Sequence, residues 1–456
     1  MAKQVDLLRG SILKSLTALA LPIMGSQLVQ MAYNLVDMIW IGRVGAGAVA
    51  AVGAAGMFMW LSNGLAILGK TGGQVLVAQR LGAGDKQAAA RYAAAAIQLA
   101  TVISLLYTLL MVVGAGPLIG FFKLNSPQVA AQARVYLIIV GLGMFFSFLN
   151  QVLIAVVNAT GNSHTPFLAM CCGLGLNYVL DPVLIFGVGP VPRMEVAGAA
   201  LATVLAQVVV FVLLVAYARQ DSCLFDQVRL TQRTTPAELA ALVRISGPAA
   251  VMNVVFPLIS MYIARMVAAF GDNAVAVQKV GSQIESISWM TADGFAAAVN
   301  SFIGQNYGAG NLKRAKKGFA AAFAMMSLWG VFCSCLLIFA AGPIFGFFIP
   351  EQEVLPLGVD YLVILGFSEL FMCWEILVEG AYAGLGHTAP PSILSMVLTM
   401  ARIPLAMVLT STALGLNGIW WSISISTICK GVILVIMFAV FWRGLQRRLE
   451  NQAAVE

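Results

Sequence analysis

Two aspartates stand inside long apolar stretches of the first half of the chain. Asp37 follows Gln30 by seven residues and Asn34 by three, so an α-helix would place all three side chains on one broad face. Asp181 follows Asn177 by four residues and precedes a proline. A carboxyl group among apolar residues and amides loses hydration of its charged form, so it can bind and release a proton near neutral pH. The pair therefore predicts a site for a proton or a small cation.

Asp181 also has a structural interpretation, in which it only caps or packs a helix that breaks at Pro182. An ionisable side chain inside a bilayer costs at least about 2.5–3.5 kcal/mol, and such residues usually serve a function. This cost favours a functional role for both aspartates.

The second half holds more charge within its apolar stretches, and two interpretations stay open. Glu375 and Glu379 are four residues apart and would face one side of a helix. They could form a cation or substrate site, or they could belong to an internal network of ion pairs. The near balance of acids and bases favours the network: Arg265, Lys279, Glu285, Asp293, Glu369, Glu375, Glu379, Arg402 and Lys430.

The elements that must position these groups are membrane-spanning helices. Of 456 residues, 60% are hydrophobic and only 10% are charged, and the mean hydropathy is +0.91. A typical soluble domain carries roughly 25% charged residues, so a soluble protein is excluded. The apolar runs are far longer than the strands of about 10 residues in a membrane barrel. The composition predicts an all-α polytopic membrane protein.

Runs long enough to cross the hydrocarbon core predict twelve transmembrane helices. Their expected limits are 15–41, 47–78, 91–114, 135–157, 166–187, 196–218, 242–269, 274–303, 318–342, 356–380, 391–414 and 418–441. With the N-terminus inside, 17 Lys and Arg residues fall in inner segments and 4 in outer ones, namely Arg43, Lys123, Arg134 and Arg193. The positive-inside rule then places both termini in the cytoplasm. The net charge of +7 reflects this orientation and contact with anionic lipid, so no nucleic-acid partner is expected.

The chain contains an internal repeat. Residues 79–84 read Q-R-L-G-A-G and residues 305–310 read Q-N-Y-G-A-G, and Pro22 matches Pro248 at the same offset of 226. We therefore expect an N-terminal six-helix lobe at 1–218, a cytoplasmic linker at 219–241, a C-terminal six-helix lobe at 242–441 and a cytoplasmic tail at 442–456. Repeats of this kind recur in transporters, although duplication for packing alone would leave the same pattern.

Four segments resemble one known family. They are Y-N-L-V-D-M-I-W-I-G from residue 33, V-A-Q-R-L-G-A-G-D from residue 77, L-N-Y-V-L-D-P-V-L-I-F-G from residue 176 and G-A-A-L-A-T-V from residue 198. Together with the span count and the repeat, they resemble the MATE (multidrug and toxic compound extrusion) family, in particular its DinF-like branch. The resemblance implies a V-shaped pair of lobes around a central cavity. It also implies export of amphipathic, often cationic compounds in exchange for H⁺ or Na⁺, from the plasma (inner) membrane of a prokaryote.

The resemblance also implies roles for particular residues. Asp37, Asn177, Asp181 and Thr203 match the cation site of the N-terminal lobe, and Pro22 matches a hinge at which protonation bends the first helix. No cofactor is expected besides the coupling ion, and no metal besides Na⁺ as an alternative ion at the two aspartates. The seventh span offers only Asn253 where some members of the family carry an acid, so their sodium site there is in doubt.

Substrate candidates are polar, aromatic and methionine side chains near the predicted site. Flexible methionines and flat rings accept ligands of varied shape. The candidates for the cavity are Gln30, Tyr33, Asn34, Asn158, Met170 and Met252. The expected partners are small amphipathic cations and membrane lipids, without ATP, and the protein is expected to be a monomer.

One motif points elsewhere and is rejected. Residues 64–71 match G-x-x-x-x-G-K-T, the phosphate-binding loop of ATPases. That loop needs a buried strand before it and a helix after it, whereas these residues fall within a predicted span. Lys70 remains as a counter-ion for a carboxylate or as a base that snorkels to the interface.

The sequence thus predicts a secondary active antiporter that is not an enzyme and that works by alternating access. A flippase for lipid-linked saccharides is the main alternative, because Lys70, Arg265, Lys279 and Arg402 could line a cationic cavity. A channel or receptor without coupled transport is a third class. The repeat and the paired aspartates disfavour it.

Overall fold

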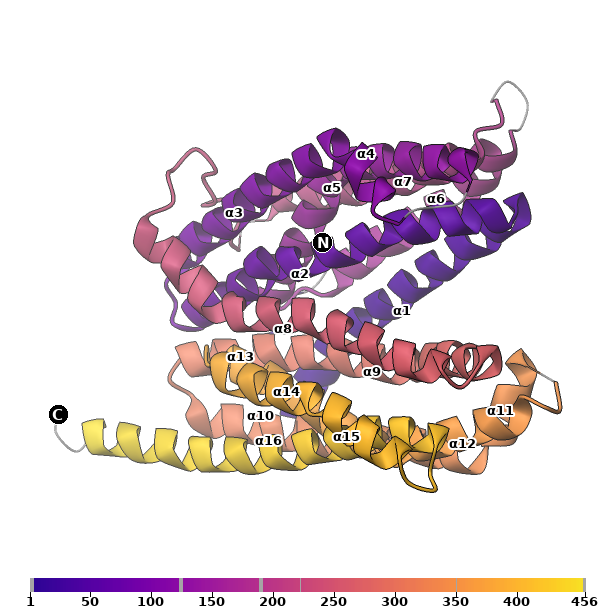
Figure 1. Cartoon of the computed structure of the whole chain (residues 1–456). Helices are drawn as coiled ribbons and strands as arrows, with labels where there is room; N and C mark the ends of the chain where they lie inside the picture. Colours follow the sequence, from indigo (N-terminus) through magenta and orange to yellow (C-terminus); the bar gives the residue numbers. More distant parts are fainter. Residues whose placement is uncertain (1–3, 123–125, 188–191, 222, 350, 454–456) are drawn as a thin grey trace. The chain divides into compact units, whose positions relative to one another are not determined.

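The computed structural model describes residues 4–122, 126–187, 192–221, 223–349 and 351–453, and these residues form helices with no strand among them (Figure 1). Lys3 and Lys123, which entered the charge count, lie outside the described residues. The first half forms α1 Ile12–Val44, α2 Ala46–Gly82, α3 Lys86–Val113, α4 Ala115–Gly120, α5 Pro127–Ala159, α6 His164–Phe186 and α7 Glu195–Gln220. The second half forms α8 Pro236–Ala268, α9 Asp272–Gly308, α10 Leu312–Phe339, α11 Ala341–Phe348, α12 Leu355–Gly366, α13 Glu369–Gly384, α14 Ala389–Met400, α15 Arg402–Thr410 and α16 Leu416–Ala453.

The polytopic helical architecture predicted from the sequence is confirmed. Within the described residues, ten helical stretches are long and apolar enough to cross a membrane, and the bent pair α12 and α13 makes an eleventh. The predicted eighth span is the 37-residue helix α9, whose Lys279, Glu285 and Asp293 make it less apolar than the others.

The tenth predicted span, 356–380, is not one straight helix. It consists of α12 and α13, which meet at a bend of 46°. The eleventh predicted span, 391–414, corresponds to α14 and α15, which together form one apolar stretch from Ala389 to Thr410 with a turn at Ala401. Pro404 explains this turn, because it lacks the amide that would bond the carbonyl of Met400 and its ring crowds that carbonyl.

The repeat is visible in the helix bounds. The helices α2, α3 and α4 begin at residues 46, 86 and 115, and α9, α10 and α11 begin at 272, 312 and 341, which is 226 residues later in each case. The short helices α4 and α11 were not predicted. Gly45 and its counterpart Gly271 both have positive φ, at 139° and 101°, which a side chain would disfavour.

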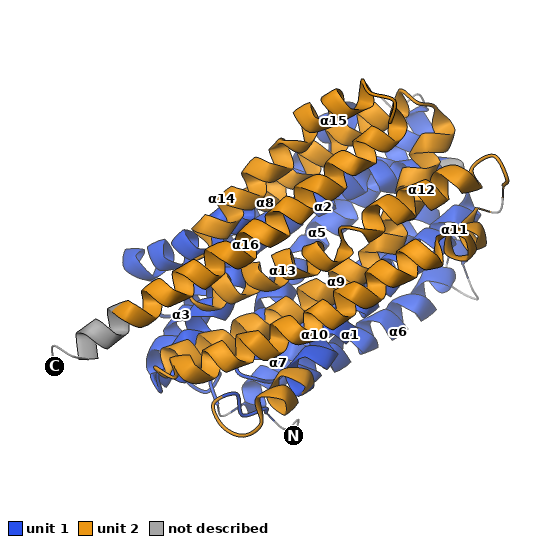
Figure 2. Cartoon of the chain, turned by 90° about the horizontal axis from the view of Figure 1, so that it is seen from below, with its two compact units in different colours: residues 1–7, 18–250 blue, residues 8–17, 251–456 orange. Residues whose placement is uncertain are grey.

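The chain divides into two compact units (Figure 2). Unit 1 comprises residues 1–7 and 18–250, and unit 2 comprises residues 8–17 and 251–456. The linker at 219–241 and the start of α8 thus lie in unit 1, whereas the sequence treated them as separate from the first lobe. Gln98 of α3 secures the linker, because its Nε2 donates to the carbonyls of Leu230 at 2.8 Å and Gln232 at 2.7 Å.

Small residues let the helices of unit 1 approach closely. A Cβ at Gly69 of α2 would lie 2.9 Å from the Cγ2 of Val152, and a Cβ at Gly73 would lie 2.8 Å from the Cβ of Ala96. These glycines therefore serve packing of α2 against α5 and α3. Residues 64–71 lie inside α2, so no strand precedes them, and their rejection as a phosphate-binding loop is confirmed.

Candidate functional site

Asp37 of α1 contacts α7 through a hydroxyl group. The Oγ1 of Thr203 lies 3.3 Å from the Oδ2 of Asp37, and it also lies 3.0 Å from the backbone carbonyl of Ala199. The hydroxyl of Tyr33, one turn before Asp37, donates to the backbone carbonyl of Thr203 at 3.4 Å. Two side chains of α1 thus face the same turn of α7, and the structure brings the predicted site residues Asp37 and Thr203 together.

Asp181 and Asn177 form the second part of the site, on α6. The Nδ2 of Asn177 donates to the Oδ1 of Asp181 at 3.2 Å, and both side chains are fully buried. The helix continues through Pro182 to Phe186. Because proline has no amide hydrogen, the carbonyl of Tyr178 loses its helical donor, which leaves a polar backbone atom one turn before the buried acid.

The two aspartates interact with each other. Asp37 lies close enough to Asp181 and Asn177 for their side chains to interact, in addition to its hydrogen bond with Thr203. At this site, three buried oxygens have no hydrogen-bond donor among the described residues: Asp37 Oδ1, Asn177 Oδ1 and Asp181 Oδ2. Oxygens in such a group can be satisfied by a proton shared between the carboxyls or by a hard cation such as Na⁺.

Glycine contacts hold α6 and α7 together beside this site. A Cβ at Gly198 of α7 would lie 2.4 Å from the backbone carbonyl oxygen of Leu184 in α6. A Cβ at Gly173 of α6 would lie 2.5 Å from the Cγ2 of Val210. The two helix backbones therefore approach closely at both ends of the stretch that carries the polar residues.

One residue of the site is not indicated by the sequence. Tyr136 of α5 is buried and lies near enough to Asp37 and Asp181 to interact with their charges. Nothing in the sequence around Tyr136 indicates a functional role, because a tyrosine in an apolar span usually packs against neighbouring helices. Its spacing from the two aspartates in the sequence does not identify it either, because its distance from them depends on how α5 packs.

Three predicted cavity residues of unit 1 lie two or more helical turns from the aspartates. Asn158 is in the last turn of α5, just before α6 begins, and Asp181 lies 17 residues into α6, which is about 25 Å of helix. Met170 is eleven residues before Asp181, or about 16 Å along the same helix. Met252 belongs to unit 2, and Gln30 lies two turns before Asp37.

Asn34 is exposed and lies one turn before Asp37, so it stays a cavity candidate alongside Tyr33. Pro22, the predicted hinge, lies inside the continuous helix α1. The hydroxyl of Ser26 donates to the Pro22 carbonyl at 3.0 Å. The missing amide at Pro22 leaves the carbonyl of Ala18 without its helical donor, which weakens the helix there.

The charges of unit 2 only partly form the balanced network favoured by the sequence. Lys430 of α16 pairs with Glu375 of α13 at 2.5 Å, so the ion-pair interpretation is confirmed for these two residues. Arg265 and Lys279 are exposed, however, and cannot balance buried acids. Glu369 is instead held by the hydroxyl of Ser288 at 2.6 Å.

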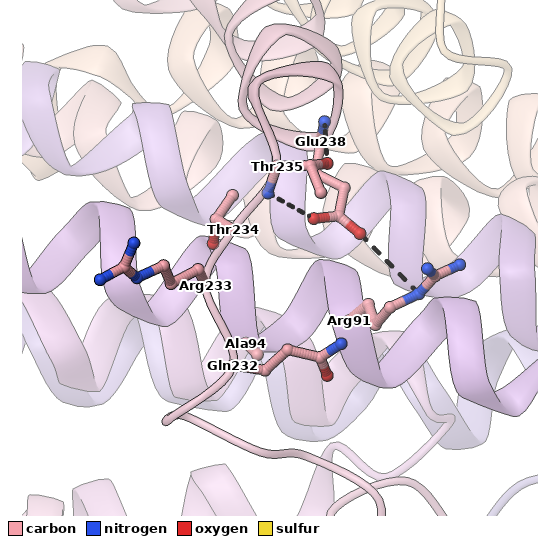
Figure 3. Close-up of a pocket in the computed structure, with 7 residues that line it drawn as sticks. All are labelled: Arg91, Ala94, Gln232, Arg233, Thr234, Thr235 and Glu238. Atoms are coloured by element: carbon pink, nitrogen blue, oxygen red, sulfur yellow. Dashed lines mark hydrogen bonds and ion pairs between the residues drawn. The ribbon is translucent and has the colours of Figure 1, made fainter.

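A small surface pocket lies at the other end of unit 1, between the linker and α3. Figure 3 shows the carboxyl of Glu238 between the backbone amide of Thr235, at 2.9 Å, and the Nε of Arg91, at 3.8 Å. The hydroxyl of Thr235 accepts from the amide of Glu238, which completes a capping box at the start of α8. These contacts anchor the linker and give no sign of transport chemistry.

The chain resembles known proteins both in sequence and in structure. A family model described as MatE matches residues 22–183 and 248–408, one segment in each half of the chain. The probable multidrug resistance protein NorM of Thermotoga maritima is 26% identical over 434 residues, which cover 94% of this chain and 92% of that protein. The FAD transporter of Shewanella oneidensis is 25% identical over 435 residues, covering 93% of this chain and 94% of that protein.

Solved structures share the fold. A multidrug resistance MATE family transporter in an outward-facing conformation has a TM-score of 0.89 and 24% identity, with 98% of this chain and 99% of that chain covered. A MATE in the straight conformation has a TM-score of 0.90 and 24% identity, covering 98% of this chain and all of that one. At this level of identity the likeness shows the fold of the whole chain.

Proposed function

Since the chain belongs to the MatE family, we propose that it is a secondary active antiporter that exports small amphipathic, often cationic compounds. Members of this family are transporters, so the chain is not an enzyme. The driving ion is H⁺, with Na⁺ as the alternative, and it binds at Asp37 and Asp181.

The contact between the two carboxyl groups carries this proposal. Two buried carboxyls within hydrogen-bonding range cannot both hold a full negative charge without cost, so one of them takes a proton or both share a cation. A cationic substrate is attracted by the same negative charge that the proton neutralises. Proton and substrate therefore compete for Asp37 and Asp181, and this competition links their opposite fluxes.

The available energy suits export against a gradient. One charge that crosses 100 mV releases about 2.3 kcal/mol, and each pH unit adds about 1.4 kcal/mol. One or two protons could therefore sustain a concentration ratio of tens to thousands. Alternating access would expose the aspartates to one side of the membrane at a time.

We assign the protein to the inner membrane of a prokaryote, with both termini in the cytoplasm and the monomer as the working unit. The relatives with matching length are bacterial, and the distribution of Lys and Arg supports the orientation. A flippase is not favoured, because the matching relatives include multidrug resistance proteins.

Proteoliposomes with an imposed gradient test the proposal. The purified protein should extrude ethidium when a pH gradient is applied, and a Na⁺ gradient at equal pH identifies the alternative ion. FAD serves as an anionic probe, because one relative carries that name. Leak of ethidium without any gradient would instead indicate a channel, and movement of labelled lipid alone would indicate a flippase.

The substitution Asp37→Asn should abolish gradient-driven efflux while leaving the protein folded, because the amide keeps the shape of the side chain. Asp226→Asn provides a matched control, since Asp226 is exposed in the linker. Gradient-driven efflux that survives Asp37→Asn unchanged would refute the site.

A further inference from the structure

A buried arginine of unit 2 is not paired with any acid among the described residues. The buried acids of this unit are Glu369 and Glu375, and its buried bases are Arg402 and Lys430. Lys430 forms an ion pair with Glu375, and Glu369 is held by the hydroxyl of Ser288. Arg402 is only 8% exposed and forms no ion pair within the described ranges. A guanidinium group stays charged in proteins, and a buried charge without a partner is unfavourable.

Two hydroxyl groups of α16 hold the side chain of Arg402 in place. The Nε of Arg402 donates to the hydroxyl of Ser426 at 3.2 Å, and its Nη2 donates to the hydroxyl of Thr427 at 3.0 Å. Ser426 donates its own hydrogen to the backbone carbonyl of Leu398 at 2.8 Å, so its oxygen is fixed as an acceptor. An arginine has five N–H donors, and these contacts use two of them. No described residue accepts from Nη1, which keeps both of its hydrogens for a ligand.

An acid and an aromatic ring lie near the guanidinium group. Glu285 on α9 is close enough to Arg402 for their charges to interact, but the two side chains form no ion pair. The carboxyl of Glu285 is half-buried and has no hydrogen-bond partner in the described part of the chain. The Cζ of Arg402 lies 5.9 Å from the centroid of the Phe256 ring on α8, and Phe256 is 38% exposed. This region of unit 2 therefore presents a positive group, a negative group and an apolar surface.

The internal repeat shows that a positive charge at this position is not required by the fold. The helices α6 and α14 begin at residues 164 and 389, an offset of 225, and at this offset Arg402 corresponds to Asn177. In unit 1, Asn177 contacts Asp181 at the proposed cation site. Ala406 stands at the position that corresponds to Asp181. The second half thus carries a base and no acid where the first half carries an amide and an acid.

A ligand that carries both charges suits these groups better than a simple cation. A carboxylate can accept from Nη1 and from the second hydrogen of Nη2 in parallel, which is the strongest contact that a guanidinium makes. A simple cation would be repelled by Arg402, and a simple anion would be repelled by Glu285. A zwitterion with an apolar part satisfies Arg402 and Glu285 together and can pack on the ring of Phe256.

We propose that Arg402 binds the carboxylate of amphipathic zwitterions, with Glu285 facing the positive part of the same molecule and Phe256 contacting its apolar part. The inference rests on the proposed export of amphipathic compounds, and it extends their class from cations to zwitterions. It gives unit 2 a role in distinguishing substrates, separate from the ion binding proposed for Asp37 and Asp181.

Two dyes that share one skeleton test this proposal. Rhodamine B has a free carboxylate and a cationic ring system, whereas its ethyl ester keeps the cation and lacks the negative charge. Fluorescence polarisation of each dye with the full-length protein in detergent, at about pH 7, gives both affinities without any gradient. The parent protein should bind rhodamine B, and failure to bind it would overturn the proposal.

The substitution Arg402→Gln should weaken the binding of rhodamine B about tenfold to a hundredfold, because the carboxylate loses its charged donor. Binding of the ester should not weaken. Arg265→Gln removes an exposed arginine of the same unit and should change neither affinity. Equal weakening of both dyes in Arg402→Gln would show that Arg402 only supports the structure, and unchanged binding of both dyes would show that it does not contact the carboxylate. Either result refutes the proposal.

Two further variants keep the test independent of the folding of Arg402→Gln. Arg402→Lys keeps the charge but cannot make two parallel bonds to a carboxylate, so it should lose affinity for rhodamine B several-fold and keep its affinity for the ester. Glu285→Gln should weaken both dyes, because both carry the cationic ring system. If Arg402→Lys affects both dyes alike, the selectivity does not come from Arg402 and the proposal fails.

Transport separates this inference from the proposed function. Efflux of the ester in a pH gradient should depend on Asp37 and not on Arg402. If Asp37→Asn abolishes this efflux while Arg402→Gln leaves the binding of rhodamine B unchanged, the antiporter stands and the zwitterion site is refuted. If Asp37→Asn has no effect on efflux, the proposed function fails, and the binding of the two dyes still decides the role of Arg402.

Discussion

The close contact between α6 and α7 yields a sharp prediction for Gly198→Ala. A Cβ at this position would lie 2.4 Å from the carbonyl oxygen of Leu184 and 2.5 Å from its carbonyl carbon. Ordinary contacts of this kind begin at 3.4 Å. The Cβ is fixed by the backbone of α7, and the atoms that it meets belong to the backbone of α6. No side-chain rotation can therefore relieve the clash, and the two helices must separate by about 1 Å.

The cost follows from the general behaviour of overpacked cores. Forcing an extra methyl group into a packed interior costs about 1–3 kcal/mol, partly through backbone shifts. Leu184 lies three residues after Asp181, and Gly198 lies five residues before Thr203, so a shift at this contact reaches both parts of the site. Gly198→Ala should therefore lower the melting temperature and also weaken the hydrogen bond between Thr203 and Asp37.

Gly175→Ala provides the matched control. Gly175 lies in the same helix α6, but a Cβ there would meet nothing within 4 Å. Alanine in place of glycine in a helix stabilises by about 0.5–1 kcal/mol, so this variant should melt at the parent temperature or above it.

Thermal unfolding in detergent, followed by tryptophan fluorescence, measures both variants, and ethidium efflux measures function. At about 2–4 °C per kcal/mol for a unit of this size, Gly198→Ala should melt about 2–12 °C below the parent. If Gly198→Ala and Gly175→Ala melt together and both transport normally, the backbone contact is not as described.

Three further predictions concern side-chain contacts. Thr203→Val removes the hydroxyl that contacts Asp37, so the affinity for the coupling ion should weaken about fivefold, whereas Thr203→Ser keeps a hydroxyl and should keep the affinity. Equal transport by the two variants would contradict a role of the hydroxyl in ion binding. Gln98→Leu removes the donor to two linker carbonyls, so limited trypsin digestion should cut the linker several times faster than in the parent protein. Gln98→Glu keeps the side-chain length but not the donor and should be cut as fast as Gln98→Leu, whereas cleavage of both variants at the parent rate would contradict the role of this donor. Burial raises the pKa of the Cys223 thiol in the linker, so a smaller fraction of the thiol is ionised to thiolate at pH 8 than in the unfolded chain. A variant with Cys223 as its single cysteine should therefore react with maleimide more slowly when folded than when unfolded, and this difference in rate should shrink as the pH rises.

Much of the membrane architecture could be predicted from local pattern. A helix that crosses hydrocarbon must satisfy its own backbone and present apolar side chains, so each span leaves a long run in the sequence. The repeat left matching glycines and prolines 226 residues apart, and the helices α2 and α9 begin at that spacing. The bend between α12 and α13 was missed because the run remains largely apolar through it.

The sequence by itself determined the helical membrane class, the repeat and the presence of two rare acids, Asp37 and Asp181, because these depend on residue type and local spacing. Only the tertiary structure decided which groups meet. It joined Asp37 to Thr203 across α1 and α7, added Tyr136 from α5 and paired Lys430 with Glu375. Such contacts depend on how closely helix backbones pack, and beside the aspartates glycines such as Gly173 and Gly198 allow the close approach of α6 and α7.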